Sequence, residues 1–236
     1  MIKVFAHRGA ESSRPENTKD AFLYALEVGA KAIELDVQLT KDNVPVVIHD
    51  YTLTRYNKDY TLPVDNYTYE ALSQIDVGSY FSTNYSYSRV PTLSSILEII
   101  PQNVLLNIEI KNTPKRHQGI EKKVADLISE YRAIDNTIVS SFDHIALKTI
   151  SKINPNLKLG FLIHYPMINP GQYVHSTGLN AVSIHPNKNI VNETFIQECK
   201  QYGYKIYPYT VKDETDYTRL TDLGVDGFFT STTDYY

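Results

Sequence analysis

The stretch Ala32–Asp50, AIELDVQLTKDNVPVVIHD, decides the expected fold and the expected site. Its first half predicts a strand over 32–37, in which aliphatic residues alternate with Glu34 and Asp36. Successive strand side chains point to opposite faces, so the two acids share a face. Neighbouring carboxylates repel each other and are costly to bury, and a bound cation removes both costs. After a turn, the apolar run 44–48 leads to His49 and Asp50, so the stretch predicts two carboxylates and a histidine close together.

The composition restricts the class of protein. The chain has 236 residues, which suits one domain over 1–236, and a formal net charge of −4, which gives no reason to expect a nucleic-acid partner. Its one cysteine excludes an intramolecular disulfide. No apolar run is long enough for a signal peptide or a bilayer span. We therefore expect a cytoplasmic protein without stable membrane insertion, and leave open a secreted form with a trimmed signal and a homodimer.

Apolar strand-like runs alternate with segments of helical period along most of the chain. Strands are expected at 3–6, 32–37, 44–48, 104–110, 136–139, 157–163, 181–185, 205–209 and 225–229. Helices are expected from 17 or 18 to 28 and at 69–75, 93–100, 118–131, 143–153, 192–202 and 213–223. Alternating strands and helices indicate a parallel sheet, and about eight such units predict an α/β fold, the (β/α)8 TIM barrel.

Two parts of the chain depart from this alternation. Residues 51–92, after the second strand region, are rich in Tyr, Asn, Ser and Thr and have weak periodicity. Such a stretch is typical of an insertion over one face of a scaffold, which either shapes a substrate pocket or forms a plain surface loop. Residues 231–236 are too short for a full final helix, so the last helix is expected to be reduced.

Acidic side chains near the ends of two predicted strands suggest a metal site. Glu34 and Asp36 are joined by Glu109, which follows the aliphatic strand at 104–110. Carboxylate oxygens suit a hard divalent cation such as Mg²⁺ or Ca²⁺ better than Zn²⁺. The alternative is a network of salt bridges in which Arg8 and Lys111 neutralise the three acids.

The same strand ends carry cations and histidines. Arg8 and Lys111 beside a metal favour a phosphate ligand, although simple charge pairing explains them equally well. His7 and His49 lie beside the acids, and a pair of imidazoles at a phosphodiester suits general acid–base catalysis. His185, at the end of the strand expected at 181–185, is expected to line the pocket.

These residues resemble the ordered motifs of the glycerophosphodiester phosphodiesterases. The motifs are His7-Arg8-Gly9, Pro15-Glu16-Asn17-Thr18, Glu34-Leu35-Asp36, His49-Asp50, Glu109-Ile110-Lys111, Ser141-Phe142 and Gly224-Val225-Asp226-Gly227. The resemblance implies a barrel with a small insertion and one Mg²⁺ or Ca²⁺ held by Glu34, Asp36 and Glu109. It also implies His7 and His49 as the acid and base, and Arg8 and Lys111 on the phosphate.

Three positions depart from the family pattern. Tyr209 stands where the family has Trp, and its ring can still stack beneath a glycerol moiety. Lys212 replaces an Asn, and Ser231 replaces an Asp. These departures bear on the alcohol group of the substrate more than on the chemistry.

The expected activity is metal-dependent hydrolysis of glycerophosphodiesters, such as glycerophosphocholine or glycerophosphoethanolamine, to glycerol 3-phosphate and an alcohol. Two alternatives stay open. One is head-group cleavage of sphingomyelin or lysophospholipids at a membrane surface, with Tyr51, Tyr56, Tyr80, Phe81, Tyr85 and Tyr87 as an apolar rim. The other is a non-catalytic glycerophosphate-binding protein. An amidohydrolase is disfavoured, because the first strand ends in His7-Arg8-Gly9 and not in His-x-His.

Overall fold

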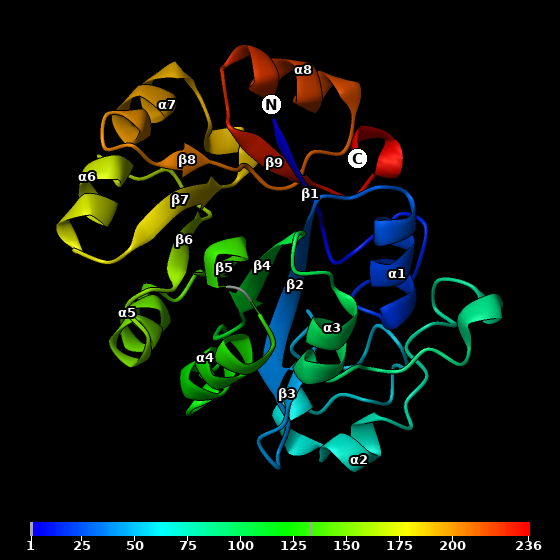
Figure 1. Cartoon of the computed structure of the whole chain (residues 1–236). Coiled ribbons are helices and arrows are strands. Elements are labelled where there is room, and N and C mark those ends of the chain that lie inside the picture. Colours follow the sequence, from blue (N-terminus) through cyan, green and yellow to red (C-terminus); the bar gives the residue numbers. More distant parts are fainter. Residues whose placement is uncertain (1, 133) are drawn as a thin grey trace.

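A computed structural model describes residues 2–132 and 134–236 and shows a ring of strands surrounded by helices (Figure 1). Eight parallel strands follow the order β8-β7-β6-β5-β4-β2-β1-β9. They are β1 (Lys3–Ala6), β2 (Ala32–Leu39), β4 (Leu105–Ile110), β5 (Thr137–Ser141), β6 (Lys158–Ile163), β7 (Ala181–Pro186), β8 (Lys205–Ile206) and β9 (Gly227–Thr230). The ring closes where Asp226 N–H donates to the Ile206 carbonyl at 3.1 Å and Val211 pairs with Thr230. The predicted TIM barrel is confirmed.

In the described part of the chain, seven α-helices cover the outside of the barrel, and polar residues cap the first turn of several of them. They are α1 (Lys19–Glu27), α3 (Leu93–Ile99), α4 (Ile120–Tyr131), α5 (His144–Ile153), α6 (Pro170–Ser176), α7 (Glu193–Lys200) and α8 (Glu214–Asp222). Thr18 accepts a hydrogen bond from the N–H of Ala21, and Asp143 accepts one from that of Ile145, so both provide N-caps. After β9 the chain forms a 3₁₀ turn, Thr233–Tyr235, in place of a full helix. The prediction of a reduced last helix is therefore confirmed.

The two faces of β2 enter different environments. Ile33, Leu35 and Val37 join the large apolar core between the sheet and the helices. The opposite face carries Glu34 and Asp36, both almost completely buried. The expected alternation is therefore real, and it sends the acids into the barrel.

Aromatic side chains fill the interior of the barrel beneath the acids. Phe5 stacks on Phe229 with ring centroids 4.7 Å apart, and it also contacts Tyr207. The ring of His185 lies over Gly160, where a Cβ atom would approach the His185 Cε1 atom to 2.4 Å. Only glycine at position 160 leaves room for this ring.

Two predicted strands differ from the structure. The run at 44–48 forms β3 (Pro45–Val47), which pairs antiparallel with β2 and stands outside the ring. The strand expected at 205–209 ends at Ile206. Pro208 has no N–H to donate to a neighbouring strand, which explains the short regular part.

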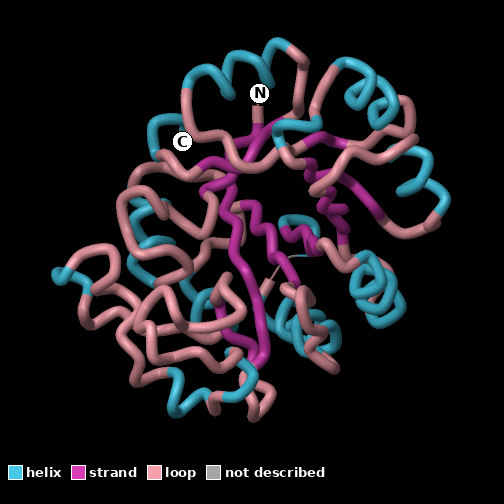
Figure 2. Tube along the Cα trace, turned by 180° about the vertical axis from the view of Figure 1, so that it is seen from behind, coloured by secondary structure: helices cyan, strands magenta, loops and turns pink. Residues whose placement is uncertain are grey.

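The predicted insertion lies beside α1 and α3 and consists mostly of loop (Figure 2). It contains α2 (Tyr69–Leu72), shorter than the expected 69–75, and two 3₁₀ turns, Val64–Asn66 and Thr83–Tyr85. Its apolar residues form a cluster of their own together with Val46 and Ile48, namely Leu53, Val64, Leu72, Ile75, Val77 and Val90. The insertion is therefore a packed unit. Two further 3₁₀ turns, Ile134–Asn136 and Lys188–Ile190, lie elsewhere in the barrel.

Candidate active site

Three carboxylates from two adjacent strands meet at the C-terminal mouth of the barrel. The parallel register of β2 and β4 places Asp36 beside Glu109, and each of Glu34, Asp36 and Glu109 offers an oxygen within 4.8 Å of the others. Burial, Asp36 and Glu109 together raise the pKa of Glu34 well above its usual value. Among the described residues, the buried Oε1 of Glu34 has no hydrogen-bond partner. This set of oxygens fits a hard divalent cation such as Mg²⁺ or Ca²⁺.

Two cations lie against the same acids. Lys111 Nζ is 2.8 Å from Glu109 Oε1 and 3.5 Å from Asp36 Oδ1, and Arg8 Nε is 3.4 Å from Asp36 Oδ2. Burial opposes ionisation of Asp36, but Lys111, His49 and Arg8 lower its pKa below the usual value. Salt bridges thus exist, yet they leave one Glu34 oxygen unpaired. The orphaned oxygen is compatible with a cation site, because a closed salt-bridge network would use all the carboxylate oxygens.

The loop after β1 orients this cluster through its backbone. Arg8 and Gly9 have positive φ angles of 52° and 76°, and the resulting turn directs the Arg8 N–H at Glu34 Oε2, 2.9 Å away. Asn17 then donates from Nδ2 to Asp36 Oδ2 at 2.8 Å. Both contacts restrict the orientation of the carboxylates without adding charge.

Each of two histidines has a carboxylate on Nδ1. His7 Nδ1 lies 2.6 Å from Glu11 Oε1, and His49 Nδ1 lies 2.7 Å from Asp50 Oδ1. An ionised carboxylate can only accept, so Nδ1 carries a proton in both rings and Nε2 is the free nitrogen. Burial alone would raise the pKa of Glu11, but the charge of His7 and its hydrogen bond help to lower that pKa to about 2. His7 Nε2 faces the acid cluster, 4.0 Å from Glu34 Oε2.

The residues surround a pocket at the mouth of the barrel. One wall is charged, and the other is apolar, with Phe142, Leu162 and Tyr209. The Tyr209 hydroxyl donates to the Ile163 carbonyl at 3.3 Å, and burial with the charge of Glu109 raises its pKa. The pocket is lined by His7, Arg8, Glu34, His49, Asn107, Glu109, Lys111, Phe142, Leu162, Tyr209, Thr210 and Phe229.

The structure thus brings the predicted acids, cations and histidines together, with Asp36 just beneath the surface of the pocket. The expectation for His185 is not met. His185 is completely buried, its Nε2 lies 2.8 Å from Ser183 Oγ, and it does not line the pocket. Burial lowers its pKa to about 3, so the ring is neutral. Because Gly160 has no Cβ atom, the space above it accommodates the His185 ring in the barrel interior, away from the pocket.

Sequence reasoning missed three charged residues around the site. Glu11 lies four positions after His7, a spacing that could have suggested a contact. Glu16 belongs to a motif already noted, but its bonds to Arg8 at 3.0 and 3.1 Å were not foreseen. Arg55 lies in the weakly periodic insertion, and nothing around it in the sequence marks its contact with Asp50.

Comparisons with known proteins agree with this geometry. A model of the glycerophosphoryl diester phosphodiesterase family matches residues 7–235. A glycerophosphodiester phosphodiesterase from Caldanaerobacter subterraneus subsp. tengcongensis is 40% identical over 229 residues, covering 96% of this chain and 93% of the relative. One from Bacillus altitudinis is 38% identical, covering 98% of this chain and 94% of the relative.

Solved structures show the same likeness. A phosphodiesterase from Oleispira antarctica, in complex with the product sn-glycerol-3-phosphate, has a TM-score of 0.86 and 27% identity, covering 98% of this chain and 93% of its own. A glycerophosphodiester phosphodiesterase from Thermotoga maritima has a TM-score of 0.80 and 27% identity, covering 100% and 96%. Within the described residues, none of the helices combines the length and the apolar character that crossing a membrane requires. The chain belongs to the glycerophosphoryl diester phosphodiesterase family.

Proposed function

We propose that the chain hydrolyses glycerophosphodiesters, such as glycerophosphocholine or glycerophosphoethanolamine, to glycerol 3-phosphate and an alcohol. One observation carries the proposal: two histidines with carboxylates on Nδ1 line a pocket together with Glu34, Glu109 and two cations, and Asp36 lies against the two acids. The complex of the Oleispira antarctica phosphodiesterase with sn-glycerol-3-phosphate supports the choice of product.

In this proposal Glu34, Asp36 and Glu109 hold one Mg²⁺ or Ca²⁺. When bound, such an ion neutralises phosphoryl charge and makes an attacking hydroxyl more acidic. Arg8 and Lys111 supply the remaining positive charge to the phosphate, the guanidinium through paired N–H groups and the ammonium as a point charge. The unpaired Glu34 oxygen supports the cation, because an orphaned buried oxygen is otherwise costly.

The histidines move the protons. Nε2 of one imidazole accepts the proton of the attacking hydroxyl, which belongs to water or to the glycerol 2-OH of the substrate. Attack by the 2-OH forms a cyclic phosphate first, and water then opens that ring to give glycerol 3-phosphate. Nε2 of the other imidazole donates a proton to the leaving alkoxide as its bond to phosphorus breaks. The carboxylates of Glu11 and Asp50 keep the Nδ1 protons in place and orient each ring. The apolar wall with Phe142, Leu162 and Tyr209 receives the carbon skeleton of the glycerol.

The first test is glycerol 3-phosphate release from both substrates, with added Mg²⁺ or Ca²⁺ and again with excess chelator. We expect release that stops in chelator and returns with the metal. His7→Ala and His49→Ala should each lower kcat by about 10²–10⁴-fold. His175→Ala is the matched control, because His175 packs on Tyr202 with ring centroids 4.9 Å apart, outside the pocket lining. Near-normal kcat in both active-site variants would refute the assigned chemistry.

A second candidate function, cleavage of lysophospholipids, is favoured by one specific observation. The loop after β6 exposes Tyr165 and Ile168 by 75% and 90%, beside the pocket residue Leu162 in the chain. Of the rim residues expected from the insertion, Tyr80, Phe81 and Tyr87 are exposed, but none of the residues 51–92 lines the pocket. Sedimentation with phosphatidylcholine vesicles that carry lysophosphatidylcholine distinguishes this candidate from the first. Lysophospholipid cleavage requires that the protein sediments with the vesicles and releases choline from them.

A further inference from the structure

A series of hydrogen-bonded side chains of alternating charge connects His49, after β3, to Arg8, after β1. Asp50 Oδ1 accepts from His49 Nδ1 at 2.7 Å, and Arg55 donates to Asp50 from Nε at 2.7 Å and from Nη2 at 2.8 Å. Arg55 Nη1 also donates to Glu16 Oε2 at 2.7 Å. Glu16 in turn accepts from Arg8 Nη1 at 3.0 Å. One guanidinium therefore joins the partner of a proposed catalytic histidine to the partner of a proposed phosphate ligand.

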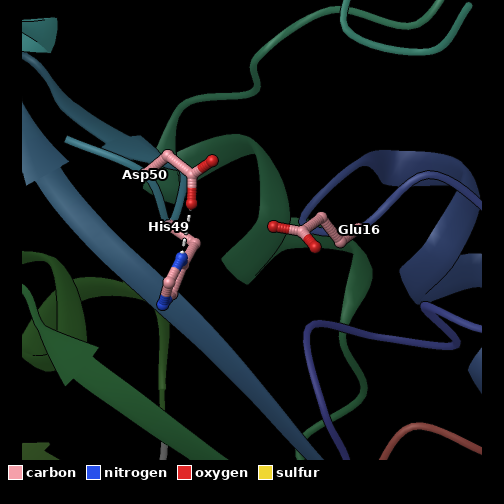
Figure 3. Close-up of side chains that lie close together, drawn as sticks. All are labelled: Glu16, His49 and Asp50. Carbon is pink, nitrogen blue, oxygen red and sulfur yellow. Dashed lines mark hydrogen bonds and ion pairs between the residues drawn. The ribbon is translucent and has the colours of Figure 1, made fainter. Parts of the chain in front are cut away.

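The guanidinium occupies a place that otherwise resembles a second cation site. The side chains of Glu16, His49 and Asp50 lie close together, with His49 Nδ1 facing Asp50, and each offers a ligand atom within 4.8 Å of the others (Figure 3). Arg55 binds both carboxylates of this group. Burial opposes its charge, but Asp50 and Glu16 raise the pKa of Arg55. The positive charge that balances Glu16 and Asp50 thus comes from the side chain of Arg55, in place of a bound cation.

Arg55 is the residue through which the insertion contacts the groups around the site. None of the residues 51–92 lines the pocket, so the contact between the insertion and the pocket residues runs through Arg55 and its partners. The insertion is also fastened to the first loop and to α1. The Tyr80 hydroxyl accepts from the Glu16 N–H at 3.3 Å, and the Ser88 hydroxyl donates to Asp20 at 2.7 Å. Tyr56, the neighbour of Arg55 in the sequence, packs against Tyr80 with ring centroids 5.3 Å apart.

We infer that Arg55 is a positioning residue, which fixes the placement of the His49–Asp50 pair relative to Arg8; the inference rests on the proposed function. Its fork binds both oxygens of Asp50 and leaves Oδ1 turned toward His49. Lysine is a point charge and cannot reproduce a planar, two-pronged contact together with a third bond to Glu16. The insertion therefore orients the proton-transfer group from outside the pocket lining.

Kinetics of Arg55→Met and Arg55→Lys test the inference. We expect Arg55→Met to lower kcat by about 10- to 100-fold, because small errors in placement of a reacting group have large effects on rate. KM should change by less than about 3-fold, because Arg8 keeps its contact with Asp36. Arg55→Lys should recover only part of the loss. Arg89→Met is the matched control and should keep kcat, because the hydrogen bonds of Arg89 to described residues go to the nearby carbonyls of Ser86 and Ser88.

Two readouts separate positioning from a merely structural role. Free guanidinium, at concentrations below those that unfold the protein, should raise kcat of Arg55→Ala but not of Arg89→Ala. The loss caused by Arg55→Met should also shrink at least threefold in an Asp50→Asn background, since the two residues act as a unit. Wild-type kcat in Arg55→Met, or full additivity with Asp50→Asn, would overturn the inference.

A third measurement requires no substrate and keeps the inference distinct from the proposed function. Proton NMR of the wild type should show a slowly exchanging His49 Nδ1–H resonance, assigned by its loss in His49→Ala. In Arg55→Met that proton should exchange at least tenfold faster, whereas Arg89→Met should leave it unchanged. An unchanged exchange rate in Arg55→Met overturns the positioning role. Failure of the wild type to release glycerol 3-phosphate overturns only the proposed function.

Discussion

Glu11 and Ser231 are 220 positions apart in the sequence, and the Ser231 hydroxyl donates a hydrogen bond to Glu11 Oε1. The same oxygen accepts from His7 Nδ1 at 2.6 Å. A second link, from the Ser12 N–H to the Ser231 carbonyl at 3.2 Å, joins the loop after β1 to the end of β9. The closure of the barrel therefore holds the carboxylate that orients His7.

Glu11→Gln should lower kcat by about 10- to 100-fold, less than His7→Ala, because the amide keeps an oxygen near Nδ1 but makes a weaker hydrogen bond than the charged carboxylate does. Steady-state kinetics with glycerophosphocholine measures the effect. Glu27→Gln on α1 is the control, since Glu27 is exposed and has the same change of charge. A kcat as high in Glu11→Gln as in Glu27→Gln would show that the carboxylate does not assist His7.

Cation binding should raise the melting temperature of the wild type. Glu34 is crowded by two acids and has an unpaired oxygen, so a cation between the three carboxylates removes repulsion. A ligand at 100 times its Kd adds about 2.7 kcal/mol to the free energy of unfolding. Differential scanning calorimetry should show the increase with Mg²⁺ or Ca²⁺ and its reversal by chelator.

The Glu34→Gln variant tests where that cation lies. It should melt close to the metal-free wild type and gain little from added cation, whereas Glu70→Gln in the exposed α2 should respond like the wild type. An equal gain in both variants would place the cation elsewhere.

Stability should decline as the pH falls below about 5. Burial opposes ionisation of both carboxylates, but their partners lower both pKa values. His7 lowers the pKa of Glu11 from 4.5 to about 2, and His49 with Arg55 lowers that of Asp50 from 3.8 to about 2. The unfolded chain therefore binds protons before the folded protein does. Each group's contribution is complete above its unfolded pKa and is lost between about pH 5 and pH 2.

Urea unfolding between pH 6 and pH 3 measures this loss, which should be on the order of 1–2 kcal/mol for each group. The double variant Glu11→Gln, Asp50→Asn should show a flatter profile in that interval. Parallel profiles for variant and wild type would assign the acid sensitivity to other carboxylates.

Arg132→Met should destabilise the fold and leave the catalytic rate unchanged. The buried guanidinium donates from Nη1 to the Ile100 carbonyl at 3.0 Å and from Nη2 to the Val104 carbonyl at 2.7 Å. Loss of the donors leaves these acceptors unsatisfied and should lower the free energy of unfolding by about 2–4 kcal/mol. Urea unfolding measures the change, with the exposed Lys152→Met as control. Equal stability of the two variants would contradict the role of this anchor.

Much of the barrel was predictable because its signals are local. Strand alternation places Glu34 and Asp36 on one face whatever the rest of the chain does, and helix caps such as Thr18 act on their own first turn. Strand ends at the mouth of the barrel then bring His7, Arg8 and Lys111 toward the acids. The parallel register between Asp36 and Glu109 follows from the fold class as a whole.

By itself, the sequence determined the class of fold and the main groups of the site, since both depend on periodicity and on which residues end the strands. Only the tertiary structure decided which groups touch. Barrel closure brings Ser231 to Glu11, the path of the insertion brings Arg55 to Glu16, and the space above Gly160 buries His185. Such contacts depend on the meeting of distant segments, and no local pattern in the chain encodes that distance.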